Sequence, residues 1–363
     1  MFKKRRTREE ARLQEQLADL RTSVTADVLG QVRDMLSLRP IVATGQPNLS
    51  ELAMAVHDIP AAHLSLKFFG YELARSLAAG MPVRETTERH VGLASKLSTQ
   101  ADMATDWVEH WCAMLQVPRI FHRKIWELAY VLQAFAENGH MVPGARGLGF
   151  GCGEEPIASY LASRGVAVTV TDLDADRAQA AGWADTGQHA ASLEKAFRPL
   201  LVDRESFDRL VTHRVADMNA IPTELRGYDF CWSVCALEHL GSIAQGMRFI
   251  EASLETLRPG GLAVHTTEFN INPDGPTIDN WPTVLFQRRH FEALAERLRA
   301  AGHDVAPFDW DLGDGPMDRF IDLPPWGHDL PAEYVKWHGE GAHLKVGLDG
   351  FVSTCVGIVV RKA

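Results

Sequence analysis

From residue 145 onward, short apolar runs rich in β-branched and aromatic residues alternate with amphipathic stretches. A nearly continuous hydrophobic strand followed by a helix is typical of a parallel sheet that is covered on both faces. The pattern therefore predicts an α/β fold. The runs are ARGLGF at 145–150, VAVTVTD at 166–172, HRVADM at 213–218, YDFCWSV at 228–234 and LAVHTTEF at 262–269, and the helices between them are expected near 154–164, 188–199 and 243–257.

The carboxyl-terminal segment HLKVGLDGFVSTCVGIVV, at 343–360, has a different pattern. It contains two strand-like apolar runs that flank Asp349 and Gly350. An Asp-Gly pair between such runs favours a tight turn and an antiparallel hairpin. We therefore expect a mostly parallel sheet that ends in an antiparallel hairpin, which is a restrictive combination.

The first third of the chain lacks strand-like alternation and carries apolar residues at helical spacing. One apolar stripe, over 8–38, serves either as core packing or as the seam of a homodimer. We predict an all-helical amino-terminal unit over 1–118, followed by a second domain over 119–363. The other helical stretches before the sheet are expected at 60–80, 86–115 and 119–137.

The charge of the chain argues against nucleic acid as a partner. Its 363 residues carry a formal net charge of −10, whereas binding to phosphates needs clustered lysine and arginine. The basic run KKRR, at 3–6, is typical of a solvated chain end.

No apolar run approaches the roughly 20 residues of a membrane-spanning helix, and no secretory signal opens the sequence. Five cysteines without a paired framework fit a reducing compartment, so we expect a cytoplasmic protein in which Cys231 and Cys235 are buried thiols.

The segment RGLGFGCGEEP, at 146–156, sets glycines at alternate positions and follows them with two glutamates. Gly149, Gly151 and Gly153 come where the first strand gives way to a helix, at the edge of a parallel sheet where ligands bind. A missing Cβ permits positive φ and close approach of a ligand to the backbone. We therefore expect these three glycines to contact a ligand.

Two features indicate the kind of ligand. Asp172 ends the next strand, nineteen residues after Gly153, where an acid is placed to accept hydrogen bonds from ribose hydroxyls. The dinucleotide pattern G-x-G-x-x-G is absent, and Glu154 and Glu155 at the start of the helix would repel a pyrophosphate. The pattern favours a nucleoside that lacks phosphates and is preferably cationic, which points to S-adenosylmethionine.

These segments together resemble the class I, Rossmann-like, S-adenosylmethionine-dependent methyltransferases over about 120–363. GLGFGCG is similar to the glycine-rich first motif, VTVTDLD to the second strand, and VADMNAIP to the segment beside the adenine. YDFCWSVCALEHLGS is similar to the fourth strand with its loop, and LRPGGLAVHTT to the turn into the fifth. The resemblance implies a Rossmann-like, mostly parallel sheet of seven strands and S-adenosylmethionine as co-substrate.

The resemblance also implies which residues meet the nucleoside of the methyl donor. Asp172 would hold the ribose hydroxyls, with Leu173 beside the adenine. Asp217 and Met218 would meet the adenine ring. Ser233, in the fourth strand, is also counted among the cofactor-binding residues.

The methionine end of the donor is less clearly marked. The acid that the family carries two residues before the first motif glycine is Gly147 here. Glu154 or Glu155 would take over the electrostatic role of that acid. The helix HRKIWELAYVLQAF, at 122–135, would by the same analogy shape the methionine end of the pocket.

Two polar clusters fall where the acceptor sits in this family. Methyl transfer from a sulfonium is an in-line displacement, so catalysis is chiefly alignment of the acceptor atom with the methyl carbon. A hydroxyl acceptor also benefits from a general base, and histidine suits neutral pH. We expect His239 or His265 to be the base, oriented by Glu238 or Glu268. The alternative is that these side chains only satisfy loop backbone.

A metal ion is a rival use of the same region. His265 and Glu268, with His239 or with His338 and His343, could ligate a divalent ion. The histidines lack a tight ligand spacing such as H-E-x-x-H. We therefore assign no metal ligands and do not expect a metal.

Residues 270–340 are long for the connection after the fifth strand and are rich in Asp, Gly, Pro and Trp, with a helix expected at 288–301. Long connections of this kind are usually lids or binding loops. We expect this segment and the amino-terminal unit to shape the acceptor site. The favoured function is O-methylation of a small molecule, such as a sugar, a glycan precursor or a secondary metabolite.

Other functions stay open on the sequence alone. The same fold supports metal-assisted, carbon or nitrogen methylation. From other classes, the alternatives are a nicotinamide-dependent oxidoreductase and a non-catalytic nucleoside-binding or scaffold protein. The missing G-x-G-x-x-G argues against the oxidoreductase, and the candidate bases beside the ligand segments argue against the scaffold.

Overall fold

The computed structural model describes residues 59–173, 193–324 and 341–363. By its internal contacts the chain divides into two compact units, residues 1–66 and 67–363. Residues 67–118 thus belong to the same unit as the sheet, while their separate functional role stays a prediction. None of the described helices is long and apolar enough to span a membrane.

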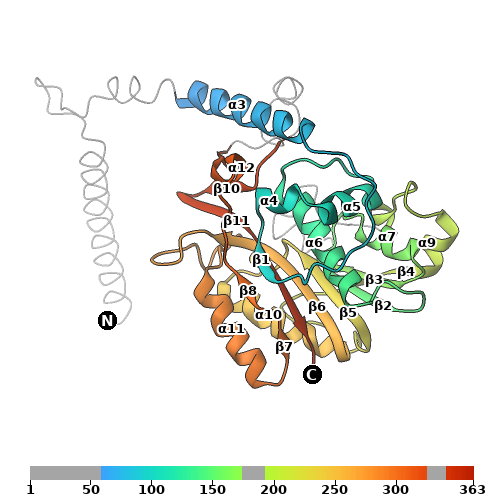
Figure 1. Cartoon of the computed structure of the whole chain (residues 1–363). Helices are drawn as coiled ribbons and strands as arrows, with labels where there is room; N and C mark the ends of the chain where they lie inside the picture. Colours follow the sequence, from blue (N-terminus) through green and yellow to red (C-terminus); the bar gives the residue numbers. More distant parts are fainter. Residues whose placement is uncertain (1–58, 174–192, 325–340) are drawn as a thin grey trace, which may run out of the picture. The chain divides into compact units, whose positions relative to one another are not determined.

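The strands of the described residues form one mixed sheet in the order β4-β3-β2-β5-β6-β11-β1-β8 (Figure 1). β2 to β6 are parallel to one another, and β11 pairs antiparallel with β6. The mostly parallel sheet is confirmed, whereas the expected count of seven is not, because the described residues form eleven strands. The strands are β1 Ser95–Leu97, β2 Arg146–Phe150, β3 Ala167–Asp172, β4 Val211–Val215, β5 Tyr228–Val234, β6 Leu257–Asn270, β7 Asp304–Val305, β8 Phe308–Asp309, β9 Ile321–Asp322, β10 Lys345–Leu348 and β11 Phe351–Arg361.

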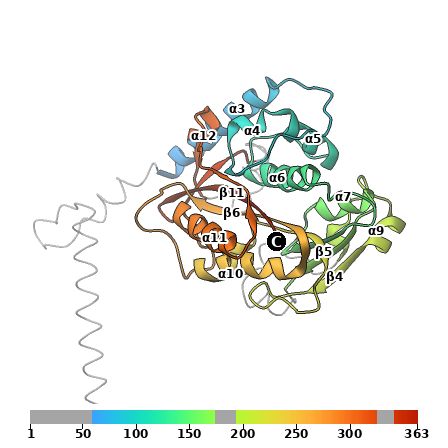
Figure 2. The ribbon, with the colours of Figure 1, turned by 60° about the horizontal axis from the view of Figure 1, so that its bottom comes forward.

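Helices cover both faces of the sheet. Figure 2 shows α6 and α7 on one side of it and α10 and α11 on the other. Ten consecutive residues of the fifteen in α6 are buried, whereas α11 buries only a stripe at helical spacing, so α6 is the more central of the two. The helices are α3 Ile59–Ala79, α4 Gln100–Met103, α5 Asp106–Leu115, α6 Arg123–Glu137, α7 Ile157–Ser163, α9 Arg204–Leu210, α10 Ile243–Ser253, α11 Arg288–Ala300 and α12 Pro316–Arg319, with 3-10 helices η2 Leu193–Ala196, η3 Leu237–His239 and η4 Leu254–Thr256.

The antiparallel hairpin expected at the carboxyl terminus is present. β10 and β11 pair antiparallel across a two-residue turn formed by Asp349 and Gly350. Both turn residues have positive φ, 47° and 83°, as a tight hairpin turn that follows the twist of the strands requires. β11 then runs beside β6 over nine residue pairs and joins the hairpin to the parallel part of the sheet.

The expectation of an all-helical segment before the sheet is wrong in one place. Residues 86–115 were expected to form one helix, but Ser95–Leu97 form β1, and helices occupy only α4 and α5 of that range. β1 pairs antiparallel with β11 and parallel with β8. Its hydrogen bonds come from strands more than 200 residues away along the chain, so local periodicity could not reveal them.

Most other expected helices lie where the spacing predicts them, as α3, α6, α10 and α11 show. The helix expected over 188–199 is only the 3-10 helix η2 within the described residues. The apolar stripe over 8–38 and the homodimer seam inferred from it lie outside the described residues.

Two glycines of the glycine-rich segment serve packing within the sheet. A Cβ on Gly147 would come within 2.6 Å of the ring of Phe230, and one on Gly149 would meet the sulfur of Cys152 at 2.2 Å and the ring of Trp232 at 2.5 Å. The rings of Phe230 and Trp232 stack on each other with centroids 6.1 Å apart. β2 therefore gives up side chains so that two large rings from β5 can lie across it.

We expect Gly149→Ala to lower the free energy of unfolding by about 1–3 kcal/mol, because the added methyl group overpacks a rigid ring. Gly80→Ala is the matched control, since its Cβ would lie 3.5 Å from the nearest atom. Chemical denaturation measures the difference. Equal stability of Gly149→Ala and the wild type would show that Trp232 moves aside without cost.

Candidate functional site

A cavity of about 600 Å³ opens at the carboxyl-terminal ends of β2, β3 and β5. Parallel strands bring their carboxyl ends to one edge, and that edge is where ligands bind in open α/β sheets. The volume is in the range of small-molecule sites. The residues that line it are Lys124, Leu128, Gly151, Cys152, Gly153, Glu154, Glu155, Pro156, Asp172, Leu173, Ala216, Asp217, Met218, Asn219, Val234, Cys235, Ala236, His239 and Leu240.

The loop after β2 forms one wall with its backbone. Gly151 and Gly153 both have positive φ, 58° and 49°, and both line the cavity. A Cβ on Gly151 would come within 2.8 Å of Ala236 on the opposite wall. Gly149, the third predicted ligand glycine, lies below Trp232 and is not part of the lining.

The acids expected to meet the nucleoside also line the cavity. Asp172 is the last residue of β3, and its Oδ1 accepts a hydrogen bond from the backbone N–H of Leu173 at 2.9 Å. Asp217 accepts from the backbone N–H of Asn219 at 2.8 Å and so shapes the turn after β4. Leu173 and Met218 add apolar surface beside the two acids.

The lining of described residues is strongly acidic. It contains four carboxylates, those of Glu154, Glu155, Asp172 and Asp217, against a single lysine, Lys124. The exposed Glu154 forms an ion pair with Lys195 at 2.9 Å. The half-buried Glu155 accepts a hydrogen bond from the indole N–H of Trp232 at 3.3 Å, and burial raises the pKa of its carboxyl well above the usual range. Even with Glu155 neutral, three acidic side chains face one lysine, so a cationic ligand is favoured over a phosphate.

Ser233 and His265 are not at the cavity. They are register partners on β5 and β6, and their side chains hydrogen-bond to each other at 2.8 Å in the interior. The other ring nitrogen of His265 contacts Ser253 at 3.0 Å, and the ring packs edge-on against Phe249 of α10. Neighbouring strand residues face opposite sides, so Val234 takes the place at the cavity that was expected of Ser233. The expectation that Ser233 binds the donor and that His265 is the base does not fit this geometry.

His239, by contrast, lines the cavity from η3. Its Nδ1 lies 3.0 Å from the backbone carbonyl of Pro282 and 3.2 Å from the hydroxyl of Thr283. A carbonyl only accepts hydrogen bonds, so the proton of the neutral ring sits on Nδ1 and Nε2 carries the lone pair. That is the tautomer which a general base needs at Nε2.

Glu238 lies next to the imidazole but is buried. One carboxylate oxygen accepts from the hydroxyl of Thr267 at 2.8 Å, and the other lies 3.9 Å from Nε2 of His239. This second oxygen has no hydrogen-bond partner among the described residues. Burial raises the pKa of Glu238 from its usual value, because the charged form is poorly solvated there. Glu238 is therefore placed to respond to a positive charge that forms on the imidazole.

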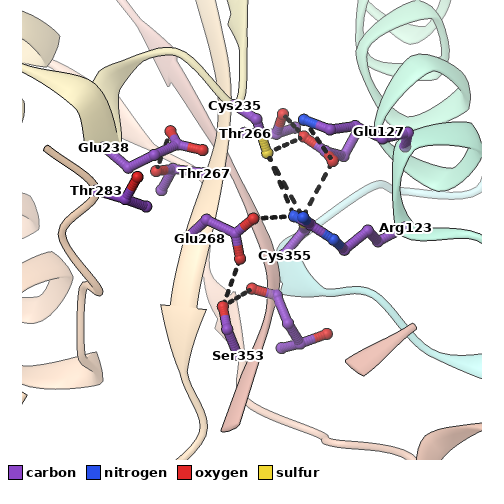
Figure 3. A network of polar contacts seen from close by, with 12 residues as sticks. Arg123, Glu127, Cys235, Glu238, Thr266, Thr267, Glu268, Thr283, Ser353 and Cys355 are labelled. Carbon is purple, nitrogen blue, oxygen red and sulfur yellow. Dashed lines mark hydrogen bonds and ion pairs between the residues drawn. The ribbon is translucent and has the colours of Figure 1, made fainter. Parts of the chain in front are cut away.

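Glu268 is held in a buried polar network behind the cavity wall (Figure 3). Its carboxylate forms an ion pair with Arg123 of α6 and accepts from the hydroxyl of Ser353 on β11. Burial alone would raise the pKa of Glu268, but the guanidinium outweighs burial and lowers it. Glu268 is thus a partner of Arg123 and is not oriented toward either histidine by a described contact.

The sequence did not single out the charged residues at the start of α6. Lys124 lines the cavity, while Glu127 is buried and accepts from Thr266 at 2.5 Å. Three charged residues lie in the first turns of α6, namely Arg123, Lys124 and Glu127. This cluster of charges on a largely buried helix is the sequence signal that could have identified these residues, because a charged side chain is costly to bury without a partner.

The family model described as a methyltransferase domain matches residues 148–265. This span runs from β2 to β6 and contains nearly all of the cavity lining. Residues 148–265 are thus similar to a methyltransferase domain. The resemblance to the class I S-adenosylmethionine-dependent methyltransferases is confirmed, and S-adenosylmethionine is the co-substrate of that family. Among curated proteins, none matches the chain in sequence.

Solved structures with a similar fold are distant in sequence. One is the [4+2]-cyclase SpnF, at 19% identity and a TM-score of 0.38, with 65% of this chain and 83% of that chain covered. Another is phosphoethanolamine N-methyltransferase 2 of Haemonchus contortus, at 16% and 0.39, with 64% and 52% covered. A third is magnesium protoporphyrin IX methyltransferase of Synechocystis, at 11% and 0.37, with 71% and 85% covered.

The buried imidazole of His265 makes stability depend on pH. Burial lowers its pKa from 6.5 to about 3, so the unfolded chain takes up this proton well before the folded chain does. The folded protein therefore loses stability as the pH falls from 6.5 toward 3. We expect His265→Asn to make the slope of unfolding free energy against pH shallower by about 1.4 kcal/mol per pH unit in that window. Denaturation at a series of pH values measures the slope, and an unchanged slope would contradict the structural role.

Proposed function

We propose that this chain transfers a methyl group from S-adenosylmethionine, bound in the cavity, to a small-molecule hydroxyl. The observation that carries the proposal is the acidic lining of the cavity, with four carboxylates and one lysine around a backbone of positive-φ glycines. Such a wall suits a nucleoside with a sulfonium and an ammonium group, and it disfavours the phosphates of a dinucleotide.

In the proposed complex the nucleoside lies across the ends of β3 and β4. Asp172 accepts hydrogen bonds from the ribose hydroxyls, and Leu173 and Met218 pack on the adenine, with Asp217 at its edge. This placement follows from the positions of these residues around the lining.

The methionine end of the donor then lies between the loop after β2 and the start of α6. Glu154 and Glu155 favour the ammonium group, and Lys124 favours the carboxylate. Gly151 and Gly153 let the donor approach the backbone, because neither position carries a Cβ.

His239 is the proposed general base. Its tautomer is fixed by the carbonyl of Pro282, so the lone pair at Nε2 can accept the proton of an acceptor hydroxyl. The carboxylate of Glu238, 3.9 Å from Nε2, stabilises the imidazolium that forms. Glu238 acts through His239 and is a positioning residue. Thr267 holds it in place.

The segment 270–340 supplies the acceptor wall in this proposal. Pro282 and Thr283, which hold His239, both belong to this segment, and the backbone N–H of Val284 donates to the carbonyl of Glu238 at 2.9 Å. A connection that holds His239, a residue of the cavity lining, is well placed to select the acceptor. We infer a sugar, glycan precursor or secondary metabolite as acceptor, in a cytoplasmic protein. His338 of this segment lies outside the described residues.

The first test is calorimetric titration of the purified chain with S-adenosylmethionine, S-adenosylhomocysteine and NADH. We expect micromolar binding of the first two and none of NADH. Asp172→Ala should weaken binding at least about tenfold, because two charge-assisted hydrogen bonds to the ribose are lost. Asp208→Ala, at an exposed acid of α9 away from the cavity, is the matched control. Unchanged affinity of Asp172→Ala would remove the ribose assignment.

The second test concerns the base. We expect His239→Ala to keep its affinity for S-adenosylhomocysteine and to lose roughly a hundredfold in turnover, because the acceptor proton has no base. Release of S-adenosylhomocysteine in the presence of a panel of polyols, sugars and phenols measures turnover. His265→Asn serves as the comparison and should retain most of the activity. Full activity of His239→Ala with an acceptor that the wild type methylates would rule out His239 as the general base.

A further inference from the structure

Three potential metal ligands meet behind the wall of the cavity, on three different elements (Figure 3). The thiol of Cys235, just after β5, lies 2.9 Å from one carboxylate oxygen of Glu127 on α6. The thiol of Cys355, on β11, lies 3.0 Å from the other oxygen. The two sulfur atoms are 3.7 Å apart. One buried carboxylate thus holds two thiols against each other.

Cys235 and Cys355 are both free thiols, on segments that are not neighbours in the sheet, because β6 lies between β5 and β11. Their sulfur atoms are 3.7 Å apart, well beyond the roughly 2.05 Å of a disulfide bond. The sulfur atoms reach toward each other across Thr266 and Thr267 of β6, and their meeting calls for another explanation.

The spacing of the sulfur atoms fits a shared divalent ion. Two thiolates that each lie about 2.3 Å from a tetrahedral zinc ion are about 3.8 Å apart, close to the separation seen here. Thiolate and carboxylate ligands together suit zinc in preference to magnesium or calcium, which take oxygen ligands alone. Arg123 lies with Nη1 at 3.6 Å from Cys355 and 3.9 Å from Cys235, where it can donate to thiolate sulfur. Hydrogen bonds of that kind support metal ligands.

The charge of the cluster stays balanced when the ion binds. Both thiols lose a proton, which adds two negative charges, and the divalent ion adds two positive ones. The surrounding charges are already matched, since Arg123 pairs with Glu268, and Lys124 lies 3.8 Å from Glu127. The buried site therefore takes up the ion without burying extra net charge.

We propose that Glu127, Cys235 and Cys355 bind one zinc-like divalent ion, with its fourth position toward the cavity wall that Cys235 forms. Three protein ligands and one open position are the arrangement of zinc sites that act on a substrate. Cys235 is half-buried and lines the cavity, so an acceptor oxygen or sulfur there lies within reach of the ion. A second grouping joins Cys235 to Glu238 and Glu268, but Glu268 already pairs with Arg123, so the first set is the better ligand set.

The test is metal binding by the full chain. Protein purified without chelators should contain close to one equivalent of zinc by elemental analysis. After metal removal, cobalt(II) should bind at one equivalent and give a near-ultraviolet sulfur-to-cobalt charge-transfer band, which only thiolate ligation produces. Absence of zinc together with absence of this band would overturn the site.

Variants identify the ligands. Cys235→Ser and Cys355→Ser should each lower cobalt(II) affinity at least about a hundredfold and weaken the charge-transfer band, and Glu127→Gln should lower affinity at least about tenfold. Cys112→Ala, on α5 away from the cluster, should bind as the wild type does. Titration with S-adenosylhomocysteine shows that each variant is folded, and it separates failure of this site from failure of the proposed donor site. Wild-type cobalt(II) affinity in both cysteine variants, or a wild-type mass two daltons low that marks a disulfide, would overturn the proposal.

Discussion

The site depends on the buried ion pair between Arg123 at the start of α6 and Glu268 near the end of β6. It joins the helix that covers one face to the strand at the centre of the sheet. Beside this ion pair, Glu127 accepts hydrogen bonds from Cys235, just after β5, and from Thr266 of β6. Removing one partner of a buried pair leaves an uncompensated charge, which costs about 3–5 kcal/mol. Because breaking the ion pair is so costly, α6 is held in a fixed position against the sheet, and Lys124 stays at the cavity.

The acidic cavity follows from the same parallel arrangement. Each strand that ends at this edge contributes polar groups whose neighbours are loop backbone and not another strand. Asp172 ends β3, Asp217 follows β4, and Glu154 and Glu155 lie in the loop between β2 and α7. The domain thereby gathers negative charge from segments more than sixty residues apart.

Much of the sheet could be predicted because each strand of a covered parallel sheet is a continuous apolar run. β5 matches its predicted run residue for residue, and the Asp349–Gly350 turn identified the hairpin. β1 was not predicted, because a strand of three residues is too short to show a periodic pattern and is formed by its hydrogen bonds to β11. Asp172 and Met218, which were predicted to meet the donor, both line the cavity, because a place at or just after a strand end is itself a sequence property.

The sequence by itself determined the fold class, the ligand edge and the acids that line it, since these follow from strand-helix alternation and from what ends each strand. Only the tertiary structure showed where each of the two candidate histidines lies. His265 turns inward and pairs with Ser233, while His239 lies at the cavity with its proton held by Pro282. It also decided that Cys235 meets Cys355. Which side of a strand a residue faces, and which distant strand lies beside it, depend on register and packing that no local pattern encodes.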